Sequence, residues 1–201
     1  MAYDDMDTWE TTGRIETLVD GIFAIALTLL VLNLSIPQLT HSISNIAIEN
    51  YLISLIPKFF TYALSFILLA IFWRINHQQF YWIKRVNTTL IWITVIWLLF
   101  VALVPFSTSL IGEYGSVQIS EIFFDVNMFL IGALSALNWY YATERGFTDE
   151  KLSLENIQKI RKLNLILPFV ALLAIGATFI TPAWSGVTYI SISIFKRIID
   201  A

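Results

Sequence analysis

Hydrophobic residues gather in six long segments along this chain, separated by short polar connections. The segments are residues 18–36, 52–73, 88–110, 119–141, 163–180 and 183–199. A helix needs about 20 predominantly apolar residues to cross a bilayer, with a range of about 17–25. The pattern therefore predicts an all-α membrane protein, with six transmembrane helices in one domain over residues 1–201. The apolar core of the last segment, 183–195, is shorter than the others.

Basic residues occur before the first segment and then in every second connection. Eleven of the twelve Lys and Arg residues lie before the first segment, after the second, after the fourth or beyond the apolar core 183–195 of the last, and Lys58 alone lies within an apolar stretch. Because cytoplasmic connections carry an excess of Lys and Arg, both termini are predicted to be cytoplasmic. Two cytoplasmic termini require an even number of spans, which supports a sixth crossing.

Composition agrees with a membrane protein and excludes several chemistries. Hydrophobic residues make up 57% of the chain and charged residues only 13%, against about 25% charged in soluble domains. No cysteine is present, so disulfides and cysteine nucleophiles are excluded. The acidic N-terminus lacks a basic segment and a cleavage site, so we expect the first span to be retained.

The chain also lacks the motifs of common enzymes and binding sites. We find no nucleophile elbow, zinc-protease motif or phosphate-binding glycine loop, and therefore expect no enzyme. Two histidines offer no metal cluster, so no metal or cofactor is expected. No basic patch with interleaved aromatic residues indicates nucleic-acid binding. A Thr-Val-Gly-Tyr-Gly filter loop, as in ordinary potassium pores, is also absent.

Three charged residues, Arg14, Glu16 and Asp20, lie at the start of the first segment. A charge at the membrane centre costs about 2.5–3.5 kcal/mol on insertion scales and less near the ends. Pairing among the three would be purely structural, whereas ionisable residues inside membranes often have a function. Both interpretations remain open from these residues alone.

The first segment also carries an apolar stripe on one helical face, with Thr28 beside it. Spacings of three and four residues place on this face Ile22, Ile25, Leu29, Leu32 and Ile36. Periodicity alone favours a packing seam between helices, and the Thr28 hydroxyl could simply bond back to the carbonyl of Ala24.

Other ionisable residues suggest two alternatives to a channel. A proton-conducting channel or small transporter could use Asp20, His77 and Asp125 as a relay, since histidine titrates near neutral pH. Glu121 and Lys58 are further candidates for buried pairing. The second alternative is a structural membrane protein, in which the stripe is only a packing surface.

One motif resembles a known family. Arg14-x-x-x-Leu18-Val19-Asp20-Gly21 and the Ile/Leu/Thr-rich segment after it resemble the Arg-x-x-x-Phe-Ser-Asp-Gly signature of the lysosomal potassium channel family (transmembrane protein 175). Asn76-His77-x-x-Phe80 is similar to the family's histidine motif, and Asn87 and Pro105-Phe106-Ser107 also match. Leu18 and Val19 depart from the usual Phe and Ser, so a hydrogen bond made by that serine is absent here.

The resemblance implies a prokaryotic six-helix member of this family. Such a protein would be a homotetrameric, potassium-permeable channel of the plasma membrane, with the first helix of each copy lining a central pore and K⁺ as its permeant ion. The implied pore constriction is formed by Ile25, Leu29 and Leu32, and selectivity is aided by Thr28. The implied polar network, near the cytoplasmic mouth, consists of Arg14, Asp20, Asn76 and His77.

Overall fold

The computed structural model describes residues 8–9, 12–35, 44–180, 186, 188–189 and 191–192. Its elements are β1 (Thr8–Trp9), α1 (Gly13–Leu29), the 3-10 helix η2 (Leu30–Asn33), α2 (Asn45–Ser54), α3 (Ile56–Trp82), β2 (Val86–Asn87), α4 (Thr88–Tyr114), α5 (Gln118–Glu144) and α6 (Leu154–Thr178). Except for a two-residue antiparallel pairing of β1 with β2, these elements are helical. Five helices, counting α1 with η2, are long and apolar enough to cross a membrane.

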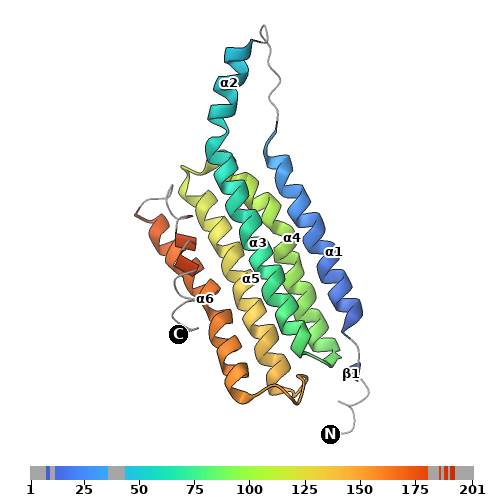
Figure 1. The fold of residues 1–201 in the computed structure, drawn as a ribbon. Coiled ribbons are helices and arrows are strands. Elements are labelled where there is room, and N and C mark those ends of the chain that lie inside the picture. Colours follow the sequence, from blue (N-terminus) through green and yellow to red (C-terminus); the bar gives the residue numbers. More distant parts are fainter. Residues whose placement is uncertain are drawn as a thin grey trace.

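The predicted sixth span, 183–199, lies mostly outside the described residues. It therefore stays a prediction, as does the position of the basic tail beyond it. The other five predicted spans each coincide with a long helix of the bundle (Figure 1).

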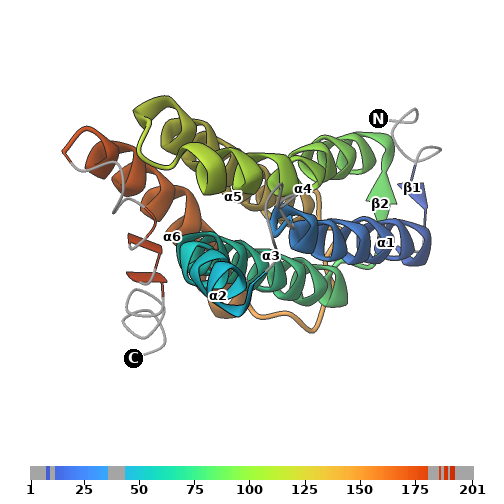
Figure 2. The same ribbon diagram turned by 90° about the horizontal axis from the view of Figure 1, so that it is seen from above.

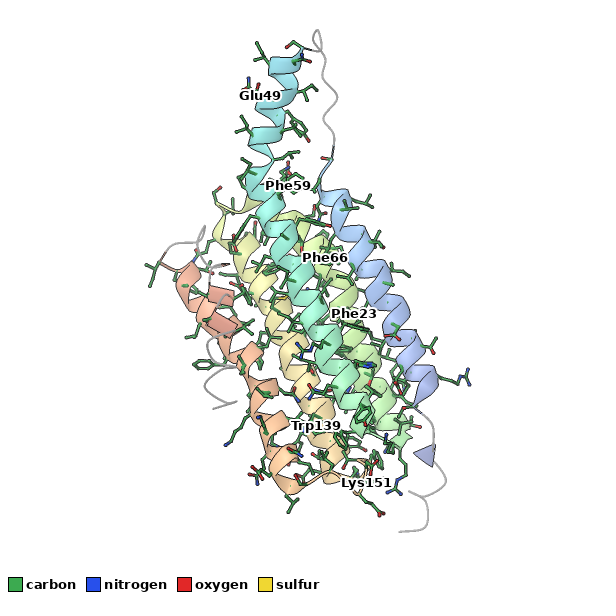
Figure 3. All side chains as sticks on the ribbon, viewed as in Figure 1. Phe23, Glu49, Phe59, Phe66, Trp139 and Lys151 are labelled. Carbon is green, nitrogen blue, oxygen red and sulfur yellow. The ribbon has the colours of Figure 1, made fainter. Side chains whose placement is uncertain are left out.

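The long helices run alternately up and down, so basic residues collect at one end. The N-terminus of α1, the C-termini of α3 and α5 and the N-terminus of α6 lie together at this end (Figure 1), which we call the basic end. Lys151 lies there, in the connection between α5 and α6 (Figure 3). Lys58, near the start of α3, lies at the opposite end and pairs with Glu113 of α4.

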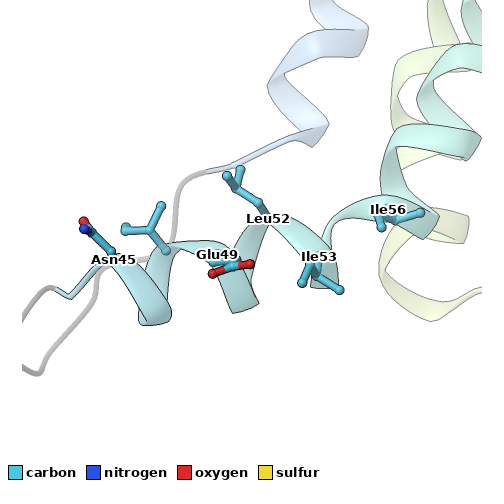
Figure 4. A pocket seen from close by; sticks show the side chains of 6 residues that line it. Asn45, Glu49, Leu52, Ile53 and Ile56 are labelled. Atoms are coloured by element: carbon cyan, nitrogen blue, oxygen red, sulfur yellow. The ribbon is translucent and has the colours of Figure 1, made fainter.

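The connection between the first two predicted spans contains part of a helix, α2, which the hydropathy pattern did not predict. The helix begins after Ser44, whose side chain accepts a hydrogen bond from the backbone N–H of Ala47 at 3.2 Å, a typical helix N-cap. It projects beyond the other helices (Figure 1) and none of its residues is buried. One of its faces borders an open, mainly apolar groove that includes Ile48, Leu52 and Ile53 (Figure 4).

The predicted end of the second span at residue 73 was also too early, because α3 continues to Trp82. The polar run after residue 73 was assigned to a connection on hydropathy. Asn76 and Gln79 are in fact buried, on the same side as Phe72 and Phe80. Gln79 donates from Nε2 to Oγ of Ser135 at 3.2 Å. Polar residues satisfied inside a bundle lower the hydropathy of a helix without ending it.

Hydrogen bonds between buried side chains join the central helices. Trp97 donates from Nε1 to the carbonyl of Ile131 at 3.1 Å, and Asn138 donates to the Thr94 hydroxyl at 3.0 Å. Apolar contact alone gives little preference for one helix arrangement in lipid, so such bonds and close packing define the bundle.

Helices α5 and α6 approach one another most closely at Gly132. A Cβ atom added at this glycine would lie 2.7 Å from Cδ of Pro168, so only glycine fits without a shift. Helix α6 itself begins where the Ser153 hydroxyl accepts from the N–H of Asn156 at 3.2 Å. The helix thus starts nine residues before the predicted fifth span, 163–180, and continues through it as one element.

Candidate functional site

Helix α1 has one face inside the subunit and one face outside it. The inward face packs on α3 and α4 and consists of Ile15, Val19, Phe23, Ala26 and Leu30. The rings of Phe23 and Trp97 lie 5.4 Å apart between centroids. Figure 2 shows α1 at one edge of the bundle, so its outward face meets no other described helix.

The predicted stripe lies on this outward face. Ile25 is 61% exposed, Leu29 42% and Leu32 68%, whereas Ile22 is half-buried. Ile36 lies outside the described residues. The stripe is therefore not a packing seam within one subunit.

Thr28 is exposed beside the stripe, and its hydroxyl bonds back to its own helix. Oγ1 donates to the carbonyl oxygens of Ala24 at 2.9 Å and Ile25 at 2.8 Å. The bond to Ala24 is the one expected from sequence. Because a hydroxyl has one hydrogen and two acceptor lone pairs, its oxygen remains able to accept from outside.

Small residues on the outward face have no role within the subunit. A Cβ atom added at Gly13 or Gly21 would meet nothing within 4 Å. Glycine inside a helix costs about 1 kcal/mol relative to alanine, and at Gly21 no packing contact among the described residues excludes a side chain.

Three residues of the implied polar network meet near the basic end. Asp20 accepts a hydrogen bond from Nε1 of Trp73 at 2.8 Å. The Trp73 ring stacks on His77 with centroids 5.6 Å apart and planes at 17°. We call these residues the Asp20 cluster, which consists of Asp20, Trp73, His77 and the buried Asn76.

A pocket of about 10 Å³ lies within this cluster, close to the smallest space that holds one water molecule, about 10–15 Å³. Its walls are Glu16, Val19, Asp20, Trp73, Asn76, His77 and Phe80. Val19, which stands where the family has serine, is buried and apolar. Packing therefore replaces the hydrogen bond that a serine would make.

Arg14 does not join the cluster within one subunit. It is exposed, and it has no hydrogen bond or ion pair with any residue that the structure describes. Glu16 instead accepts from the Thr12 hydroxyl. The pairing considered among Arg14, Glu16 and Asp20 is thus absent from the single chain, and Arg14 is left facing outward.

The relay considered for proton transport is not assembled. Asp125 accepts from the Tyr189 hydroxyl at 2.8 Å and from Thr178 Oγ1 at 3.3 Å. At about 1.5 Å of rise per residue, it lies roughly 20 Å along the bundle from His77. Among the described residues, no group of three or more His, Asp or Glu is placed to hold a metal ion.

Sequence reasoning missed Trp73 as the partner of Asp20. The signal was available in the topology. Asp20 lies near the start of one span and Trp73 near the end of the next, and such positions face each other in an antiparallel pair.

Comparisons with known proteins agree with this fold and motif. A family profile described as Endosomal/lysosomal potassium channel TMEM175 matches residues 14–105. A protein named potassium channel from Chamaesiphon minutus is 38% identical over 104 residues, which are 51% of this chain and 50% of that protein. Another, from Streptomyces collinus, is 30% identical over 146 residues, 67% of this chain and 66% of that protein. The chain spans about half to two thirds of the length of these curated relatives.

Solved structures match over nearly the whole chain. The crystal structure of a lysosomal potassium-selective channel TMEM175 homolog from Chamaesiphon minutus has a TM-score of 0.80 and 28% identity, covering 94% of this chain and 98% of that one. A crystal structure of the potassium channel MtTMEM175 with a nanobody fusion has a TM-score of 0.67 at 17% identity, which supports the fold alone. These proteins are named as channels and not as enzymes.

The bond between Trp73 and Asp20 can be tested by a double-mutant cycle. Trp73→Phe keeps an aromatic ring against His77 but removes the donor to Asp20. We expect it to be coupled to Asp20→Ala by about 0.5–1.5 kcal/mol, the usual net value of one hydrogen bond. Thermal unfolding of the four proteins in detergent measures the coupling.

The control is Trp92→Phe, since Trp92 is 61% exposed on α4 and has no bond to Asp20. Its effect should add to that of Asp20→Ala. Additivity of Trp73→Phe with Asp20→Ala would contradict the bond.

Proposed function

Since this chain belongs to the TMEM175 family, we propose that it forms a homotetrameric, potassium-permeable cation channel in the plasma membrane of a prokaryote. The observation that carries the proposal is the outward face of α1. Four copies around an axis would each supply one such helix to a central pathway.

The residues on this face distinguish a pore wall from a lipid-facing surface. A surface that meets only lipid is uniformly apolar, but this face includes Thr17, Asp20, Gly21 and Thr28, all exposed. Small residues allow helices to approach closely in membranes. An added Cβ at Gly13 or Gly21 would meet nothing within 4 Å, so these glycines leave open space that would permit such approach between copies.

The exposed aliphatic residues would form the constriction. Ile25, Leu29 and Leu32 are three to four residues apart, so four copies would stack three apolar rings at about one helical turn from each other. Rings of this kind gate by excluding water. This is the assignment that the family motif implies for the three residues.

Thr28 would supply oxygen ligands for K⁺ in the proposed pore. Its hydrogen is used within the helix, so its oxygen would turn lone pairs toward the axis, and four such oxygens would replace part of the hydration shell of K⁺. An arrangement of four hydroxyls has fewer ligands than a carbonyl filter loop. We therefore expect weaker selectivity than in channels with such a loop.

The Asp20 cluster would set the rotation of the pore helix. The bond between Asp20 and Trp73 ties α1 to α3 near the basic end, below the three apolar rings. Arg14, exposed and without a partner among the described residues, would complete the network across a subunit boundary. The positive-inside rule places this end on the cytoplasmic side.

Assembly is tested at the glycines. Gly21→Leu should abolish the tetramer while leaving the subunit folded, because a leucine there would separate the copies. The matched control is Gly176→Leu, since Gly176 of α6 also has nothing within 4 Å of an added Cβ. Mass measurement by light scattering in detergent should give four copies for wild type and control, and fewer for Gly21→Leu. A monomeric wild type would contradict the assembly.

The constriction is tested by shortening one apolar ring. Ile25→Ala should raise potassium flux several-fold in reconstituted liposomes, because a wider and less apolar ring wets more readily. Leu165→Ala removes similar apolar volume from the exposed side of α6 and should leave flux unchanged. Equal flux in all three proteins would exclude Ile25 from the pathway.

Selectivity is tested with the near-isosteric change Thr28→Val, which removes the hydroxyl but keeps the branched shape. We expect the reversal potential under opposing potassium and sodium solutions to move toward zero. Thr28→Ser, which retains a hydroxyl, should stay close to wild type. A reversal potential that Thr28→Val leaves unchanged would rule out the hydroxyl as a selectivity element.

A further inference from the structure

A groove of about 250 Å³ lies between α3, α6 and Ile192. It is separate from the outward face of α1, since α6 and α1 occupy opposite sides of the bundle (Figures 1 and 2). Most of its lining is isoleucine and leucine, including Ile71 and Leu163. Its polar lining residues are Arg74, Gln78 and Asn164.

Two of these polar groups have no partner among the residues that the structure describes. Asn164 is only 5% exposed, and its Nδ2 has no hydrogen-bond acceptor. A buried donor left unsatisfied costs free energy. Arg74 is exposed and has no hydrogen bond or ion pair with any described residue. Both groups are donors, so the groove is suited to an acceptor that carries negative charge.

The depth of the groove points to the lipid bilayer as the source of this acceptor. Arg74 lies eight residues before the end of α3 and Asn164 ten residues after the start of α6. Both are therefore about 12–15 Å inside the basic end at 1.5 Å per residue. Arg74 directly follows the second apolar segment, so its guanidinium would lie at the edge of the hydrocarbon, where long basic side chains reach toward the head groups. A phosphate group drawn to Arg74 would pair with this charge.

The size and charge of the groove limit which class of molecule can bind there. Pockets that enclose a whole small molecule have volumes of about 300–1,000 Å³, so 250 Å³ suits one part of a larger, flexible molecule. Acidic phospholipids are concentrated in the cytoplasmic leaflet, and basic pockets between transmembrane helices on that side bind their head groups. The basic end is the one predicted to face this leaflet.

We propose that this groove binds one acidic phospholipid of the cytoplasmic leaflet. Arg74 binds the phosphate with paired N–H donors, which is the geometry that guanidinium and phosphate share. An acyl chain lies along Ile71 and Leu163 and continues into the bilayer. A bound lipid would thereby fill the groove that α3 and α6 line together.

Native mass spectrometry of the purified full-length protein tests the proposal with defined lipids. The protein is titrated in detergent with phosphatidylglycerol or with phosphatidylcholine, and retained lipid per subunit is counted. Wild type should prefer phosphatidylglycerol roughly tenfold, the effect expected of one charge-assisted contact. Arg74→Gln should lose this preference. Lys151→Gln removes a charge from the same end but outside the groove, and should keep it.

A second variant, which keeps Arg74, tests the proposal even if Arg74→Gln does not fold. Leu163→Trp leaves Arg74 in place and fills the groove, so it should also lose retained phosphatidylglycerol while circular dichroism stays unchanged. The proposal is overturned if both variants retain the lipid as wild type does, or if inorganic phosphate alone displaces the bound lipid. Disulfide trapping of a Gln78→Cys variant to a second copy would also overturn it. None of these readouts depends on ion permeation.

Discussion

Helix α1 is held by polar contacts at its two ends, and the proposed pathway depends on this attachment. Asp20 accepts from Trp73 near the basic end, and Asn33 donates to the carbonyl of Pro105 at 3.3 Å near the other. Between them, Phe23 packs against Trp97. Apolar burial does not choose a helix rotation in lipid, because lipid tails are as apolar as leucine. The two polar contacts and the aromatic pair therefore determine which face of α1 is left uncovered.

The central helices provide the rigid support for this attachment. Side chains of α3, α4 and α5 are joined by buried hydrogen bonds, such as those of Gln79 with Ser135 and of Asn138 with Thr94. Unsatisfied polar groups are expensive in hydrocarbon, so these bonds resist separation of the helices. A firmly joined group of helices can hold a fourth by one face only, and leave its other face free for contacts with copies of the chain.

Sequence predicted most of the architecture and only part of the site. Long apolar runs identify membrane helices well because every backbone group must bond within its own helix. Hydropathy failed where polar residues face the protein interior, as at Asn76 and Gln79, and where a helix such as α2 lies beyond the bundle. The outward face of α1 was recognised as a stripe, but periodicity could not distinguish packing from exposure. The bond between Asp20 and Trp73 required the relative height of two helices, which no single segment contains.

The close approach of Gly132 to Pro168 has a consequence for how this chain can change over time. An added Cβ at residue 132 would lie 2.7 Å from Cδ and 2.9 Å from the backbone nitrogen of Pro168. Because the backbone nitrogen remains whatever residue stands at 168, replacing the proline alone would not make room for a side chain at 132. Among related sequences glycine should therefore persist at 132, and a larger residue there should be accompanied by a wider separation of α5 from α6.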